Sequence, residues 1–136
     1  MFLSRLNNRE KNIFMSLALA VARADGIVLD SEKRMLSDYA SEMGLSLENP
    51  VPEKNFEALL AEINETSSDQ TKRIIYVELR ALANVDENIA VEEKTLLYSI
   101  EQAFCFDKKT ISLCINLLDN YIFACKNLIK FIEIIE

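Results

Sequence analysis

The sequence predicts an all-α fold, a compact bundle of about seven helices with two pseudo-symmetric halves. Three observations favour this fold class. The 136 residues include only two Gly and two Pro, too few for the tight turns of an all-β protein. Ala, Leu, Ile, Glu and Lys, which favour helix, dominate the chain. The third observation is a repeat, in which residues 20–36 recur as residues 81–97.

The repeat has the pattern of an internal duplication. In each copy an Asp ends an Ala-rich apolar run, and a Glu-Lys pair opens the next periodic segment seven residues later. Six residues are unchanged between the copies, and in the first copy they are Ala20, Ala22, Asp25, Glu32, Lys33 and Leu36. Half of all residues are hydrophobic, enough to bury a substantial core. We therefore expect one domain over residues 1–136, with repeat halves at about 5–64 and 67–136.

The first half is expected to hold three helices, at about residues 5–24, 30–43 and 52–64. Apolar residues recur in them at three- and four-residue spacing. The first helix ends in a stretch that is apolar on nearly all sides, as expected of a helix surrounded by others. Gly26 and Gly44 fit left-handed residues that end helices, and Pro52 suits the first turn of the third helix.

The second half is expected to hold four helices, which end at about Val85, Phe104, Asp119 and Glu136. Ser67 and Gln70 fit a capping box at the start of the first of these helices. Asp107 fits the cap of the third. The last, over residues 121–136, is either a separate helix or a kinked continuation of the one before it.

Residues 111–135 are unusually apolar, although five polar residues interrupt them: Asp119, Asn120, Lys126, Asn127 and Lys130. This segment either completes the core as a covering helix or forms a docking surface. The second interpretation predicts a homodimer face or a site for a protein partner, because Ile134 and Ile135 lie where burial within one subunit is not assured.

The net charge of −7 and the pI near 4.7 disfavour nucleic acid as a partner, because Lys and Arg must neutralise its phosphates. The same balance suits divalent cations, basic partner segments or simple solubility. The chain has no His, which removes Ser-His-Asp and Cys-His catalysis. There is no Gly-rich loop to cradle a phosphate, so we expect no enzyme.

Three cysteines, Cys105, Cys114 and Cys125, lie in apolar helical stretches without a Cys-x-x-Cys pair. We expect reduced, buried thiols in a cytoplasmic protein, with a disulfide framework or a zinc cluster as alternatives. The apolar run Ile13–Ala22 is similar to a secretory signal. Because the second copy contains a matching Ala-rich helix, we expect this run to belong to the fold. No run reaches the length of a transmembrane helix.

The candidate site consists of four carboxylates, Asp25, Glu32, Asp86 and Glu93. Each Asp–Glu pair joins the end of one helix to the start of the next, and a pseudo-twofold relation would bring the two loops together. Four carboxylates in one place would suit a hard divalent cation, Ca²⁺ or Mg²⁺. The alternative is structural, because a Glu in the first turn of a helix is stabilised by its N–H groups and dipole.

At Ala24-Asp25-Gly26 with Glu32, and again at Asp86 and Glu93, the chain resembles the tellurite-resistance TerB-like family. The same helical domain occurs in some DjlA-type membrane co-chaperones. Over about residues 10–120, the resemblance implies an all-α domain with an acidic, metal-binding site at the four carboxylates. It also implies a stress-associated scaffold or sensing module with membrane protein partners, rather than an enzyme. The sequence departs from the family at Glu87, where Gly is usual.

Three hypotheses follow. The first is a non-enzymatic TerB-like binding or scaffold module whose acidic site takes a divalent cation or a basic partner segment. The alternative is a purely structural or oligomerising helical domain that uses the apolar C-terminal surface, with the acids serving only as helix caps. A third hypothesis, an enzyme with paired carboxylates, needs a cleft that the sequence does not indicate.

Overall fold

The computed structural model describes residues 1–45, 55–83 and 89–134. Within these ranges the chain forms helices and loops without a strand, which confirms the all-α fold class. The elements are a short 3₁₀ helix η1 (Leu3–Arg5) and the α-helices α1 (Asn8–Ala22), α2 (Asp30–Met43), α3 (Phe56–Thr66), α4 (Asp69–Ala83), α5 (Val91–Ala103) and α6 (Lys108–Glu133). The chain divides into two compact units, unit 1 (Met1–Cys105) and unit 2 (Phe106–Glu136). The boundary between these units, after Cys105, does not coincide with the boundary expected between the repeat halves at about residues 64–67.

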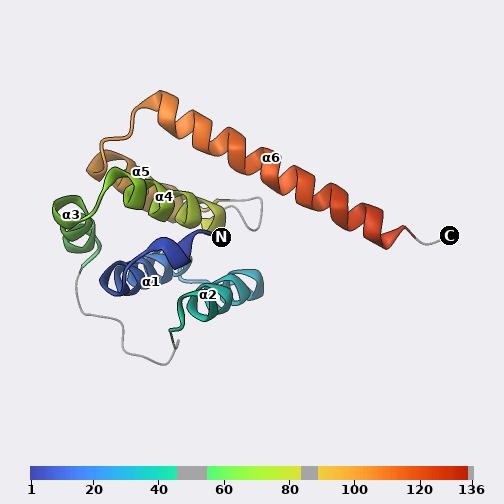
Figure 1. Ribbon diagram of the computed structural model, residues 1–136, viewed down its shortest axis with the longest axis horizontal. Helices are drawn as coiled ribbons and strands as arrows, with labels where there is room; N and C mark the ends of the chain where they lie inside the picture. Colours follow the sequence, from blue (N-terminus) through green and yellow to red (C-terminus); the bar gives the residue numbers. More distant parts are fainter. Residues whose placement is uncertain (46–54, 84–88, 135–136) are drawn as a thin grey trace. The chain divides into compact units, whose positions relative to one another are not determined.

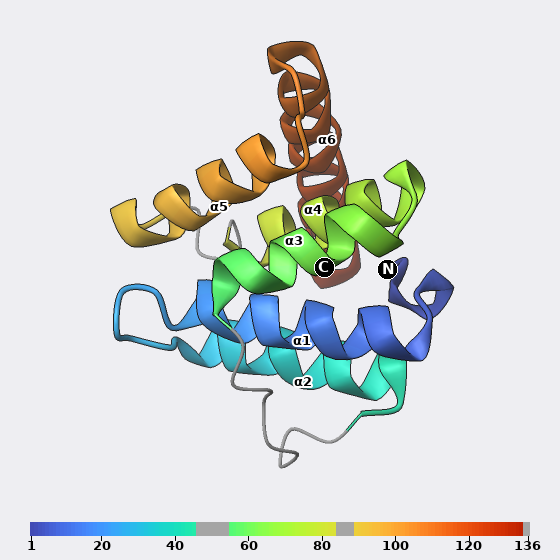
Figure 2. The same cartoon turned by 90° about the vertical axis from the view of Figure 1, so that its left-hand side faces the viewer.

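Helix α1 lies at the centre of unit 1, where it contacts α2, α3, α4 and α5. Figure 2 shows α1 and α2 as an antiparallel pair, with α3 crossing in front of the other helices. Five α1 side chains are fully buried, namely Phe14, Leu17, Ala18, Val21 and Ala22. Two of these residues, Ala18 and Ala22, are small and leave room for neighbouring helices to pack closely against α1. The sequence-based expectation of a helix surrounded by others is met by α1.

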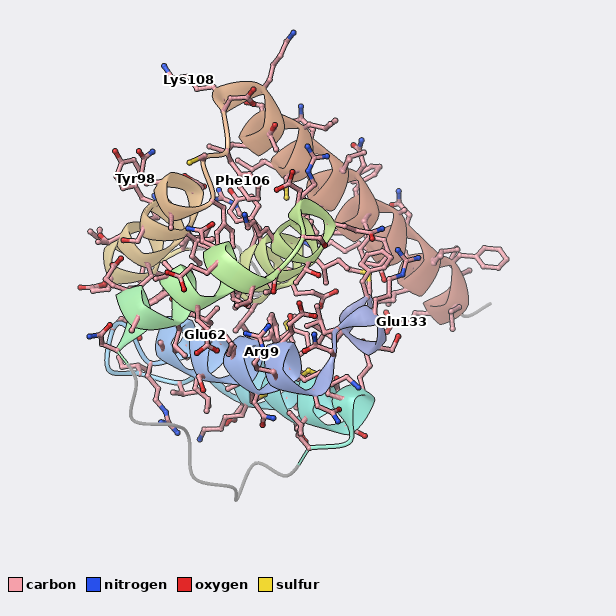
Figure 3. All side chains as sticks on the ribbon, turned by 60° about the vertical axis from the view of Figure 1, so that its left-hand side comes forward. Arg9, Glu62, Tyr98, Phe106, Lys108 and Glu133 are labelled. Atoms are coloured by element: carbon pink, nitrogen blue, oxygen red, sulfur yellow. The ribbon has the colours of Figure 1, made fainter. Side chains whose placement is uncertain are left out.

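Local hydrogen bonds fix where α1 begins. Asn7 Oδ1 accepts the Glu10 N–H at 2.8 Å, and Glu10 Oε1 accepts the Asn7 N–H at 3.0 Å, which is a capping box. Glu10 Oε2 also accepts a hydrogen bond from the Ser67 hydroxyl at 2.6 Å. In the same first turn of α1, Arg9 forms an ion pair with Glu62 of α3 at 3.5 Å (Figure 3). The start of α1 is thereby tied to α3 and to the turn that follows α3.

The N-terminal segment is held by two carboxylates from different helices, Glu42 of α2 and Glu78 of α4. Glu78, 1% exposed, accepts the Phe2 N–H at 3.1 Å and pairs with the Met1 amino group at 3.0 Å. Glu42 accepts the Leu3 N–H at 2.8 Å and pairs with the same amine at 3.1 Å. Burial alone would lower the pKa of the amine, but its hydrogen bonds to Glu78 and Glu42 outweigh burial and raise it. These contacts join η1 to α2 and α4.

Two expected helix starts are wrong. α3 begins at Phe56 and not at Pro52, which lies outside the described residues, and Asn55 Oδ1 caps it by accepting the Ala58 N–H at 2.7 Å. At α4, Ser68 Oγ accepts the Thr71 N–H at 3.2 Å. Ser68 therefore caps α4, and the expected Ser67–Gln70 capping box is wrong because the helix begins one residue later. The Ser67 hydroxyl donates to Glu10 in a tertiary contact.

Unit 2 contains a single long helix, α6, whose ends at Lys108 and Glu133 are labelled in Figure 3. Asp107 Oδ1 caps it as expected, accepting the Thr110 N–H at 2.7 Å. Of the two alternatives for residues 121–136, a continuation of the preceding helix is the one observed, since α6 runs through Asp119 to Glu133 (Figure 1). No Gly or Pro lies between residues 108 and 133, and Asp119 is exposed, so nothing there interrupts the backbone hydrogen bonds.

The Glu78 contacts give a prediction about stability and pH. In the protein with a free Met1 amino group, Glu78→Gln is expected to lower the free energy of unfolding by about 1–3 kcal/mol, because a charged hydrogen-bond acceptor is lost. The amine pKa is raised above its ordinary value of 8.0. The ion-pair contribution is therefore fully present below pH 8 and is lost as the pH rises through the raised pKa.

Urea denaturation of wild type and Glu78→Gln at pH 7 and pH 10 measures this effect. The stability gap between them is expected to narrow at pH 10. Glu57→Gln, at an exposed position in the first turn of α3, is the control and should match wild type. If the difference in unfolding free energy between wild type and Glu78→Gln were the same at pH 7 and pH 10, the Met1 amine would not be the stabilising partner of Glu78.

Candidate functional site

The first acidic loop joins α1 to α2 and contains Asp25, whose side chain is exposed. Its Oδ1 accepts the Ile27 N–H at 3.0 Å, which closes a turn around Gly26. Gly26 has φ of +81°, the left-handed conformation that the sequence predicts for it. The negative charge that follows the C-terminus of α1 is thus partly compensated by a loop N–H group.

Glu32 opens α2 and is 2% exposed. Its Oε1 accepts the Leu29 N–H at 3.1 Å, so the carboxylate caps the helix by reaching back to the preceding residue. Leu29 has no side-chain oxygen to complete a reciprocal box. The adjacent Lys33 lies 4.0 Å from Asp30 in an exposed ion pair. The geometry at Glu32 matches the helix-capping alternative for this residue.

The second acidic loop is described only from residue 89 onward, so Asp86 and Glu87 lie outside the described residues. Glu93 is buried in the first turn of α5, the place that Glu32 occupies in α2. Figure 2 shows the α1–α2 turn and the first turn of α5 at the same end of unit 1. The structure therefore brings Glu32 and Glu93 to one end of unit 1, with Asp25 on the exposed turn.

This arrangement does not amount to a formed metal centre in the described part of the chain. No group of three or more Cys, Asp or Glu side chains there is arranged to hold a metal ion. A site built from all four carboxylates stays a prediction, because Asp86 is outside the described residues. The described residues do show a buried carboxylate in the first turn of the helix that follows each acidic loop, Glu32 in α2 and Glu93 in α5.

Sequence reasoning missed three other buried glutamates, Glu10, Glu78 and Glu101. Glu101 in α5 accepts a hydrogen bond from the Tyr76 hydroxyl and pairs with Arg80 at 3.4 Å, which links α5 to α4. A signal was present, because Glu78 lies midway between two apolar residues at four-residue spacing, Ile74 and Leu82. An acid inside an apolar stripe indicates a buried, hydrogen-bonded carboxylate.

The C-terminal helix exposes most of the large apolar side chains that unit 2 contains. Their exposed fractions lie between 50% and 76%. They are Leu113, Leu117, Tyr121, Phe123, Leu128, Ile129, Phe131, Ile132 and Ile134. No described helix is long and apolar enough to cross a membrane. An exposed apolar surface of this size is typical of a binding surface.

The cysteines are free thiols in this structure. Cys105, at the end of unit 1, is exposed and adopts a left-handed conformation with φ of +57°. The expectation of a buried thiol is therefore wrong at Cys105, where the chain turns after α5. Cys114 and Cys125 lie on α6 and are half-buried.

Comparisons with known proteins identify no relative. No protein-family model, no curated protein and no solved structure matches this chain. The resemblance to the TerB-like family therefore rests on the repeated loop residues alone, and function has to be argued from geometry.

The Glu32 hydrogen bond gives a prediction about its role. Glu32→Ala is expected to lower the free energy of unfolding by about 1–2 kcal/mol, because the Leu29 N–H loses its acceptor. Glu32→Gln retains an amide oxygen and should lose less. Thermal and urea unfolding measure both, with the exposed Glu57→Ala as the control for an acid in the first turn of a helix. Equal losses in the Ala and Gln variants would mean that the charge itself, not the hydrogen bond, is required.

Proposed function

We propose that this chain is a non-enzymatic interaction module, in which unit 1 is the scaffold and α6 binds a partner protein. The observation that carries the proposal is the exposed apolar surface of α6. Monomeric proteins rarely leave a contiguous apolar patch of this kind in water. A 26-residue amphipathic helix is also a common element of helix-mediated recognition.

The scaffold role is supported by the core of unit 1, which is built around α1 and has its own capped helices. The corresponding hairpins α1–α2 and α4–α5 are consistent with the internal duplication and with a TerB-like bundle. On that resemblance, the proposal extends to a stress-associated, cytoplasmic module with a membrane-bound protein partner. Several buried glutamates already have structural hydrogen bonds, which supports a binding role over acid–base catalysis.

Site-specific photo-crosslinking in the full chain tests this proposal. A benzophenone amino acid at Leu128, 62% exposed, is expected to form an adduct with another polypeptide in cells that express the protein. The same amino acid at Asp119, an exposed polar position of α6, is the control, because Asp119 is not part of the apolar surface. Adducts from Leu128 that map only to residues 1–105 of the same chain would contradict the proposal.

A second candidate function is binding of a divalent cation or a basic segment at the acidic end of unit 1. It is favoured because the α1–α2 turn, which contains the exposed Asp25, and the first turn of α5 lie at the same end of unit 1 (Figure 2). Oxygen ligands from such loops suit Ca²⁺ and Mg²⁺. This candidate is independent of α6.

Calorimetric titration of the metal-free protein with Ca²⁺, Mg²⁺, Mn²⁺ and Zn²⁺ tests the cation hypothesis. It predicts saturable heat that Asp25→Asn/Asp86→Asn abolishes. The exposed Asp38→Asn in α2 is the matched control and should bind as wild type does. Absence of heat from folded wild type, together with an unchanged melting temperature in each ion, would rule out this cation site.

A further inference from the structure

We infer that Cys105 is a strained hinge between α5 and α6, with a second conformation in which the two helices join into one. The inference rests on the proposed function, because it concerns how unit 1 carries the partner-binding helix α6. Cys105 is the last residue of unit 1, and Phe106 is the first of unit 2. Within the described ranges Cys105 is also the one residue other than Gly with a positive φ, at +57°. Backbone strain therefore falls at the boundary between the units.

The end of α2 shows which residue this kind of turn favours. Gly44 follows α2 with φ of +71°, as Cys105 follows α5. The two residues are 61 positions apart, the same separation as between the two copies of the sequence repeat. In both turns the N–H group donates to the carbonyl three positions earlier at 3.2 Å, and the preceding residue, Met43 or Phe104, is 6% exposed. The two turns are alike, but only the first has the residue that favours this conformation.

The Cβ atom of Cys105 makes its conformation costly. In the left-handed region a Cβ lies too close to the following carbonyl oxygen, which disfavours this conformation about five- to thirtyfold. Gly has no Cβ and avoids the cost. Because Cys105 is exposed, burial of its side chain does not offset the strain. The neighbouring residues therefore hold the turn.

Two contacts of neighbouring residues favour the turn. Phe104 is buried and so anchors the end of α5. Asp107 Oδ1 accepts the Thr110 N–H at 2.7 Å and caps the start of α6. Such a cap stabilises a helix start by about a factor of five, which is comparable with the strain at Cys105. The cap and the strain oppose each other, so the turn and a joined helix lie close in free energy.

The sequence permits the joined helix. No Gly or Pro occurs between residues 53 and 136, so no residue between α5 and α6 breaks a helix. With Cys105 in the right-handed conformation, the Thr110 N–H would donate to the Phe106 carbonyl instead of to Asp107. The result is one helix from Val91 to Glu133. A partner that binds α6 more tightly in one of the two conformations shifts the population toward it.

Pulsed electron–electron double resonance between two spin labels tests the hinge. One sample carries labels at Thr95→Cys and Asn116→Cys, and a second carries them at Thr95→Cys and Asn127→Cys, all at exposed positions. A helix rises about 1.5 Å per residue, so the joined helix gives about 32 Å in the first sample and about 48 Å in the second. Native thiols are removed by Cys114→Ala, Cys125→Ala and the substitution under test at residue 105.

Three substitutions at residue 105 differ in how well they tolerate the left-handed conformation. Cys105→Ser keeps a Cβ and is the reference, in which the joined helix is expected as a minor population. Cys105→Gly should lower the ratio of joined helix to turn about five- to thirtyfold. Cys105→Val should raise this ratio about fivefold or more, because a β-branched residue is a severe outlier at positive φ. Equal ratios in the three variants, or absence of the two joined-helix distances from Cys105→Val, would overturn the inference.

Two further substitutions, made in the Cys105→Ser reference, separate the hinge from a general loss of stability. Asp107→Ala removes the cap of α6 and should raise the ratio of joined helix to turn about fivefold. Gly44→Ser places similar strain in the turn after α2, inside unit 1, and should leave the ratio unchanged. Equal shifts from Asp107→Ala and Gly44→Ser would overturn the inference, because the effect would not arise at the turn between α5 and α6.

The hinge and the proposed function fail in distinguishable ways. Unchanged distances in all three residue-105 variants, together with a Leu128 photo-adduct to another polypeptide, would overturn the hinge and leave the binding role of α6 intact. Distances that shift as expected, together with Leu128 adducts that map only to residues 1–105 of the same chain, would support the hinge and overturn the binding role.

Discussion

The burial of the apolar part of α1, from Ile13 to Ala22, is the constraint on which the rest of unit 1 depends. Because α1 contacts α2, α3, α4 and α5, the side chains of this part are apolar except for Ser16, and buried positions such as Ala18 and Ala22 are small. Phe14, for example, packs edge-to-face against Tyr39 of α2, with ring centroids 5.3 Å apart. Once α1 is surrounded, its C-terminal turn and the start of α5 lie at the same end of unit 1, which positions the acidic loops.

Buried carboxylates are the second organising feature of unit 1. A carboxylate removed from water is costly unless hydrogen bonds or a cation replace its hydration. Glu10, Glu32, Glu78 and Glu101 each accept such bonds, and Glu78 and Glu101 also pair with positive groups. The acidic residues of unit 1 therefore stabilise its fold, whereas residues 106–136, whose four Lys and four acidic residues balance, offer apolar surface on α6. This separation of charge and apolar area is why the acidic loops and α6 are proposed to serve different functions.

Features that depend on local pattern could be predicted from the sequence. The periodicity of apolar residues gave the bounds of α2 and nearly those of α5, and the two Ala-rich runs indicated helices followed by equivalent acidic turns. Features that depend on tertiary contacts could not be predicted. Ser67 was expected to cap α4, but it donates to Glu10, a residue 57 positions away in the chain. The apolar stripe around Glu78 indicates a buried carboxylate, but its hydrogen-bond partners in the N-terminal segment cannot be predicted from a local pattern.

The candidate site was predictable to a similar extent. The repeat placed a Glu at the start of α2 and of α5, and both are buried. The exposed surface of α6 was foreseen as one of two alternatives, because amphipathic spacing alone does not say whether a helix covers its own core. The sequence likewise left open whether the helix that begins at Lys108 would continue through Asp119, and the structure shows that it does.

Native-state hydrogen exchange of the full chain tests the central claim most directly, namely that unit 1 is held by the burial of α1 and that α6 is an interaction helix outside that core. The account predicts that α1 amides exchange only through global unfolding of unit 1. It predicts that α6 amides exchange faster, through openings that leave unit 1 folded. Equal exchange free energies for α1 and α6 would contradict it, because the two helices would then form one cooperative unit.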